Sequence, residues 1–168
     1  MFRVRKGPRG SVILELEHEE ALILRTLPDR IRKLLEAPDF GDRVVQRLFP
    51  RAYKDPSKDA EFRELLSKDL IARKLEGAAA LEKALDEATE EDRDSVVTLT
   101  PATFDLVLAC INDARLIIGT KLDITEDTWK ADVDPEDPDA FELALLHYLS
   151  VLEENLIVAV GQGGGGKE

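Results

Sequence analysis

The sequence contains one cysteine, two histidines and few aromatic residues, and these low counts exclude several classes of protein. A single cysteine, Cys110, cannot form a disulfide within the chain, which excludes a disulfide-stabilised fold and an intramolecular two-cysteine redox switch. Its position in the most apolar segment predicts a buried, inert thiol; a redox-active thiol is the open alternative. With 168 residues, the chain can bury an ordinary core without cross-links.

Basic residues are also in deficit. Lysine and arginine number 23 against 35 aspartates and glutamates, giving a net charge of -12. Residues 123–142 alone contain nine acids and one base, Lys130. Such a surface repels polyphosphates, so nucleic-acid binding by the whole surface is disfavoured.

Targeting segments are not apparent either. We find no apolar run of about 18 residues, the length needed to span a membrane, and the N-terminus lacks the apolar segment of a signal peptide. The sequence therefore predicts a cytoplasmic protein that does not associate with a membrane.

Motifs for catalysis and metal binding are missing. The segment 15–18, Glu-Leu-Glu-His, occurs once, whereas helical di-iron sites need such a motif twice. There is no Gly-x-Ser-x-Gly nucleophile elbow, and the C-terminal glycines are not placed between a strand and a helix as a phosphate loop requires. We expect no enzyme activity, metal or cofactor; an unrecognised hydrolase or metalloenzyme, suggested only by the many carboxylates, is a further hypothesis.

Residues 101–118 form the most apolar segment of the chain. Thr100 can cap a helix, Pro101 suits its first turn and Gly119 can end it. Apolar side chains recur at i, i+3 and i+4 and also occupy most of the remaining circumference. The sequence therefore predicts a core helix that is packed on several sides.

The N-terminal residues predict a basic β-hairpin. Residues 2–6 and 11–16 alternate apolar and polar side chains around a turn at 7–10. Because an isolated hairpin is marginal in water, we expect a third strand, for which residues 95–99 are the candidate. Four bases precede the first acid: Arg3, Arg5, Lys6 and Arg9. They are the candidate partner-binding residues, with a solvated charged face as the alternative interpretation.

The other segments mostly follow a helical period. Four further helices are expected: 17–37, kinked by Pro28; a short helix capped by Asp42; 57–88, with a break at 67–69; and 137–160. Residues 89–94 are expected to be a loop. The fold class is mainly α (α+β), a single domain of about five to six helices with a small antiparallel sheet. It spans residues 1–160 and is followed by a flexible glycine-rich tail, 161–168.

Asp113 and Arg115 are the charged residues of the core helix. If this helix is buried, both need partners, since an unpaired buried charge is very costly. We predict that they form a structural polar pair or pair with neighbouring helices; the alternative is a recognition point at an exposed edge. Self-association is a further hypothesis, because the core helix and the last helix carry more apolar surface than packing on one side of each helix would bury.

Several short segments resemble one known family in their order and spacing. They include Glu19 to Leu24, Arg47 to Tyr53, Asp59 to Arg63 with Asp69 and Leu70, Asn112 to Leu116 with Gly119, and the region of Tyr148. The chain resembles the actinobacterial family called domain of unknown function two thousand and seventeen, whose better-known members are AosR-like oxidative-stress regulators.

The resemblance implies a non-enzymatic cytoplasmic protein that acts in transcription control through a protein partner, a sigma factor or RNA polymerase. A direct DNA-binding regulator that uses the basic hairpin is one alternative. A proteostasis accessory protein is another, because genes of the family often lie near that of a Clp-protease adaptor. Redox sensing through an internal disulfide is not expected, since Cys110 is alone.

Overall fold

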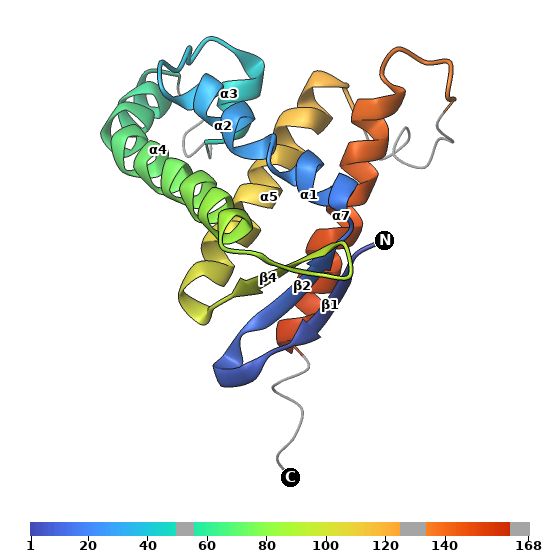
Figure 1. Ribbon diagram of the computed structural model, residues 1–168. Coiled ribbons are helices and arrows are strands. Elements are labelled where there is room, and N and C mark those ends of the chain that lie inside the picture. The colour runs from blue at the N-terminus through green and yellow to red at the C-terminus, as the bar shows by residue number, and fades with distance from the viewer. Residues whose placement is uncertain (50–55, 125–133, 162–168) are drawn as a thin grey trace.

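The computed structural model describes residues 1–49, 56–124 and 134–161. Most helices lie in the upper part of the molecule and a small sheet lies below them, while α7 (Ala140–Gly161) runs down behind the sheet (Figure 1). This arrangement confirms the mainly α (α+β) fold class. The predicted tail, 161–168, lies outside the described residues except for Gly161, and so does residue 129, the only tryptophan.

In the described residues, the sheet has four antiparallel strands in the order β1-β2-β4-β3. β1 (Arg3–Lys6) and β2 (Val12–Leu16) form the predicted hairpin, and β4 (Asp94–Leu99) pairs with β2 as the expected third strand. The prediction of a loop at 89–94 is wrong, because β3 (Thr89–Glu91) pairs with β4. β3 is short and wholly exposed, so its sequence shows no apolar alternation.

α5 (Pro101–Lys121) is the predicted core helix. Thr100 caps it by accepting a hydrogen bond from the backbone of Thr103, and Pro101 occupies the first turn, as expected. The helix continues past Gly119, which was expected to end it, because the backbone bonds carry on to Lys121. α5 lies between α4 and α7 and also contacts α2 and α3 (Figure 1). These neighbours account for its nearly uniform apolar character.

Two predictions about helix continuity are wrong. The expected kinked helix 17–37 is two helices, α1 (His18–Leu24) and α2 (Leu27–Leu35), with Pro28 in the first turn of α2, where it removes no helical hydrogen bond. Conversely, α4 (Pro56–Asp86) is continuous across the expected break at 67–69. α4 contacts α2 and α5, so its apolar residues follow two stripes instead of one.

The other α-helices in the described part of the chain are α3 (Arg43–Arg47) and α7 (Ala140–Gly161). Asp42 caps α3 as predicted, since its side chain accepts the backbone N–H of Val44 at 2.8 Å. α7 begins later than expected, because Asp137 accepts the backbone N–H of Asp139 in a turn before the helix.

α7 also corrects the analysis of apolar runs. Among the described residues it is the one helix that is long and apolar enough to cross a membrane by length and composition. The core helix of a globular domain meets the same criteria. Since α7 packs against α5 and β1 and buries leucines along one side, it is a core helix here.

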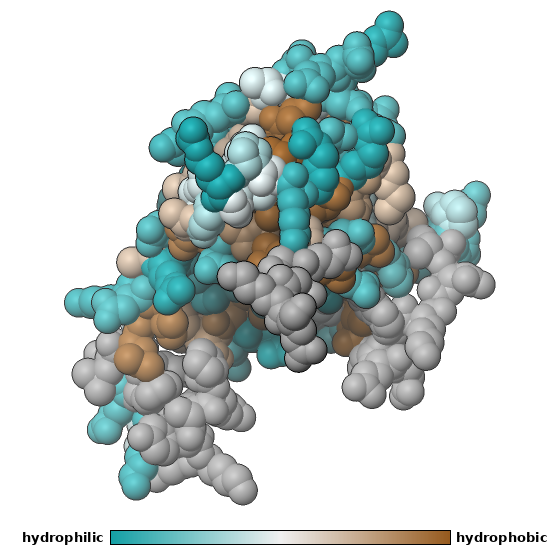
Figure 2. Space-filling view, turned by 90° about the horizontal axis from the view of Figure 1, so that it is seen from below, coloured by the Kyte–Doolittle hydropathy of each residue, from teal (hydrophilic) through white to brown (hydrophobic). Residues whose placement is uncertain are grey.

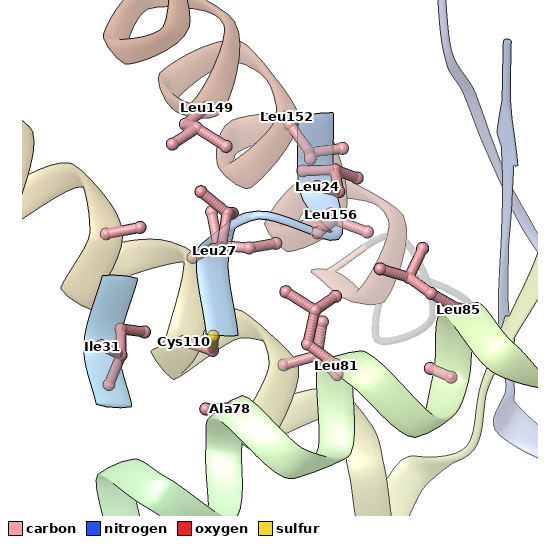
Figure 3. Packing of buried hydrophobic residues seen from close by; sticks show 14 of the residues in the cluster. Leu24, Leu27, Ile31, Ala78, Leu81, Leu85, Cys110, Leu149, Leu152 and Leu156 are labelled. Carbon is pink, nitrogen blue, oxygen red and sulfur yellow. The ribbon is translucent and has the colours of Figure 1, made fainter. Parts of the chain in front are cut away.

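The hydrophobic core contains side chains from both the helices and the sheet. Leucine, isoleucine and alanine side chains from α1, α2, α4 and α7 belong to one core cluster, which also contains Cys110 of α5 (Figure 3). From below, the core meets the inner face of the sheet, to which β2 and β4 contribute Val12, Leu14, Leu16, Val97 and Leu99. The hairpin is therefore fixed to the body of the domain through its inner face.

Candidate functional site

The candidate site is the basic hairpin. Its turn is held by hydrogen bonds from the backbone N–H of Gly7 to the Ser11 carbonyl at 2.8 Å and from the Ser11 hydroxyl to the Pro8 carbonyl at 2.7 Å. Arg9 adopts a left-handed conformation, with φ of 58°. The turn places Arg9 at the tip of the hairpin, while the bases of β1 follow the edge of the sheet.

The four bases have unequal surroundings. Arg3 and Arg5 share one carboxylate, Glu15, at 2.8 and 3.3 Å, and Asp94 lies 3.8 Å from Arg3. Both arginines are largely exposed, so these pairs stabilise the fold little. Lys6 and Arg9 are exposed and form no ion pair within the described part of the chain. The hairpin thus keeps an excess of positive charge on a protein that is acidic overall.

The sequence analysis missed the role of Glu15. A local signal for it was present, because a hairpin with its turn at 7–10 places Arg3 opposite Glu15. Opposite charges in directly paired positions of a sheet attract.

Asp113 and Arg115 do not pair with each other. Asp113 is buried and accepts a hydrogen bond from Lys74 Nζ of α4 at 2.8 Å. Arg115 donates from Nε to Ser150 at 3.0 Å and forms an ion pair with Glu153, both on α7. The two residues therefore connect the core helix to different neighbours. Burial raises the pKa of Asp113, and the hydrogen bond and positive charge of Lys74 partly offset this.

Four arginines of α2, α3 and the preceding turn make similar links. Arg25, Arg30 and Arg32 pair with acids on other helices, namely Asp86, Glu142 and Glu82. Arg43 pairs with Asp123, just beyond the end of α5, and donates to the Thr120 carbonyl within α5. The pair between Arg30 and Glu142 is bidentate, at 2.7 and 2.6 Å, and it lowers the pKa of Glu142. Many charged side chains of the helical part thus serve to join helices.

A buried polar cluster near the N-terminus was also missed. Glu20 accepts the backbone N–H of Phe2 at 2.9 Å and that of Glu17 at 2.8 Å, which joins β1 to the start of α1. The Tyr148 ring packs edge-on against Phe2 with centroids 5.7 Å apart. Its hydroxyl makes no hydrogen bond of normal geometry within the described residues, and its pKa is raised by burial and then by the charge of Glu20. Glu17 and Glu20 form a capping box, which the spacing of the two acids could have indicated.

Cys110 is fully buried in the core. Burial, and secondarily the negative charge of Asp113, raise the pKa of its thiol to about 12. Because the thiolate is the reactive form, the folded protein holds this cysteine in an unreactive state.

This leads to a testable result. At about pH 8, a disulfide reagent such as DTNB should modify Cys110 of the native protein at least about 100-fold more slowly than the same cysteine in denaturant, because the thiol is both protonated and enclosed. The absorbance of the released thiolate measures both rates. Equal rates would show that Cys110 is accessible and return redox chemistry to consideration.

Metal binding finds no support in the described residues. Nowhere in 1–49, 56–124 and 134–161 do three or more His, Cys, Asp or Glu side chains form a group that could hold a metal ion. The single Glu-x-x-His segment ends with an exposed His18 at the start of α1.

Comparison with known proteins identifies a family for this chain, although neither the curated proteins nor the solved structures give a significant match. The model of the family described as a domain of unknown function, DUF2017, matches residues 1–160. The match covers all the described secondary-structure elements apart from Gly161, the last residue of α7. This chain therefore belongs to the DUF2017 family.

Proposed function

We propose that this protein is a non-enzymatic, cytoplasmic regulatory factor that acts by binding another protein. The observation that carries the proposal is the basic hairpin, where Lys6 and Arg9 form no ion pair within the described residues and Arg3 and Arg5 share Glu15. In the helical part, by contrast, Asp113, Arg115 and several arginines join one helix to another. The resemblance to AosR-like regulators supports a partner in the transcription machinery, a sigma factor or RNA polymerase.

Binding to purified components tests this function. Immobilised protein should bind RNA polymerase or a sigma factor from the same organism, and replacing Arg3, Arg5, Lys6 and Arg9 with alanine should weaken binding by at least about tenfold. A variant with Lys33, Arg47, Lys68 and Arg73 replaced by alanine has the same net charge and is the matched control. Absence of binding to polymerase and to every sigma factor would contradict the proposal.

Direct DNA binding is the second candidate, favoured by the exposure of all four bases at one end of the molecule. Glu15 between Arg3 and Arg5 and the net charge of -12 count against it. A mobility shift with duplex DNA in low salt distinguishes the two, because phosphate contacts are strongest there. A shift abolished by the four alanine substitutions would favour the DNA-binding function.

A further inference from the structure

β1 is an open edge of the sheet. Within the described residues its only partner strand is β2. Gly7 donates to Ser11, and in an antiparallel pair bonded and non-bonded positions alternate. The backbone groups of Arg3 and Arg5 therefore form hydrogen bonds with β2. Those of Val4 and Lys6 point away from β2. Two N–H and two C=O groups are available for a further strand.

The charges on this edge select the kind of strand that can pair with it. Arg3 and Arg5 lie on the outer face of β1, next to the open edge. A second copy of β1 would place like charges across from each other, which is destabilising, and bases on edge strands are a known defence against such pairing. The opposite edge, β3, carries Glu90 and Glu91 and would repel an acidic strand. An acidic strand is therefore accepted at one edge and rejected at the other.

α7 supplies an apolar surface beside the same edge. It packs against β1, and its Tyr148 contacts Phe2, the residue before this strand. Val151, Asn155 and Val158 follow at i+3, i+7 and i+10 from Tyr148, so they line the adjacent side of the helix. Val151 and Val158 are exposed, at 39% and 49%. The lower end of the molecule, where the hairpin turn and the end of α7 lie, shows hydrophobic surface between hydrophilic side chains (Figure 2).

We propose that β1 binds an acidic, extended segment of a partner protein as a fifth strand of the sheet. Acidic side chains of this segment lie opposite Arg3 and Arg5 on the outer face. Aliphatic side chains alternate with them and lie toward the exposed valines of α7, since a strand beyond β1 extends the sheet by about 4.8 Å in that direction. The inference rests on the proposed function, that of a protein-binding factor, and specifies the chemistry of the partner.

A short synthetic peptide is the probe. A hexapeptide of alternating glutamate and valine should bind the ¹⁵N-labelled protein and shift the amide signals of Val4 and Lys6 more than those of β3. The same amides should exchange with solvent more slowly in the complex, because they become hydrogen-bonded. A peptide of alternating lysine and valine is the control for charge and should not bind.

Two variants of one residue separate strand pairing from simple charge attraction. Lys6→Ala removes a charge and keeps the backbone N–H, whereas Lys6→Pro also removes the N–H that points outward, a replacement that edge strands tolerate. We expect Lys6→Pro to weaken peptide binding at least about tenfold relative to Lys6→Ala, because it removes a hydrogen bond and blocks the edge. Unchanged amide signals in α5 and α7 verify that Lys6→Pro is folded.

The outcomes are distinct. Equal binding by Lys6→Ala and Lys6→Pro, binding of the lysine peptide, or no binding of the glutamate peptide would each overturn the inference. Light scattering that shows concentration-dependent dimers or larger oligomers joined through β1 would also overturn it, because a second copy of this protein would then pair with the edge. If a purified transcription component binds Lys6→Pro as well as wild type, the proposed function stands and only this mode of binding fails.

Discussion

Replacing Lys74 with methionine is expected to lower the free energy of unfolding by about 2 to 4 kcal/mol near neutral pH. Lys74 is the hydrogen-bond partner of Asp113, whose side chain is only 6% exposed in the core helix. Methionine fills a similar volume but cannot neutralise the carboxylate, so a charge stays buried without compensation. Denaturant titration followed by circular dichroism measures the loss.

Two further variants test the cause. Adding Asp113→Asn to Lys74→Met should recover more than half of the lost stability, because the amide carries no charge. Lys83→Met is the matched control on the same helix. Lys83 pairs with Glu87 at 3.9 Å, and both side chains are about two-thirds exposed or more, at 74% and 68%. Lys83→Met should lower the free energy of unfolding by less than about 0.5 kcal/mol. Similar decreases for the Lys74 and Lys83 variants would show that burial is not the cause.

The destabilisation should also depend on pH. Since the pKa of Asp113 is raised in the folded protein, the folded state holds this proton more tightly than the unfolded chain. The contribution of Asp113 to stability is therefore fully present at acidic pH and is lost as pH rises through its folded pKa. Loss of Lys74 raises that pKa further. The difference between Lys74→Met and wild type should accordingly be smallest at acidic pH, where this carboxyl is protonated in both proteins, and grow as the pH rises toward neutral.

The sequence predicts best those elements whose signal is local. The hairpin, the strand at 95–99 and the core helix follow from alternation, from a turn sequence and from a capping threonine with a proline, all within a few residues. β3 has no such signal, because three exposed residues at an edge need no apolar alternation. α4 was divided wrongly because two neighbouring helices impose two apolar stripes on it.

The candidate site divides in the same way. The bases of the hairpin are adjacent in sequence and could be identified as a group, and their shared partner Glu15 follows from the register of the hairpin. The partner of Asp113, by contrast, lies on another helix, 39 residues away. Which base reaches Asp113 depends on how α4 packs on α5, and no pattern within either helix determines that packing.

A close contact between α4 and α5 at Gly77 gives the second large effect. Replacing Gly77 of α4 with alanine is expected to destabilise the protein by about 1 to 3 kcal/mol, although alanine normally stabilises a helix relative to glycine by about 1 kcal/mol. A Cβ atom at position 77 would lie 2.9 Å from the carbonyl oxygen of Leu106, which is backbone and cannot rotate away. The two helices would have to separate.

Gly119 of α5 is the matched control. A Cβ atom there would meet only Leu146 Cδ2, at 4.0 Å, so Gly119→Ala should stabilise the protein by about 0.5 to 1 kcal/mol. Thermal unfolding of both variants measures the difference. Because the same Cβ at position 77 would lie 3.7 Å from Cys110 Cβ, separation of α4 and α5 should also loosen the packing around this thiol. Modification of Cys110 by a disulfide reagent should then be faster in Gly77→Ala than in wild type, and unchanged labelling together with unchanged stability would show that the helices do not approach as closely as described.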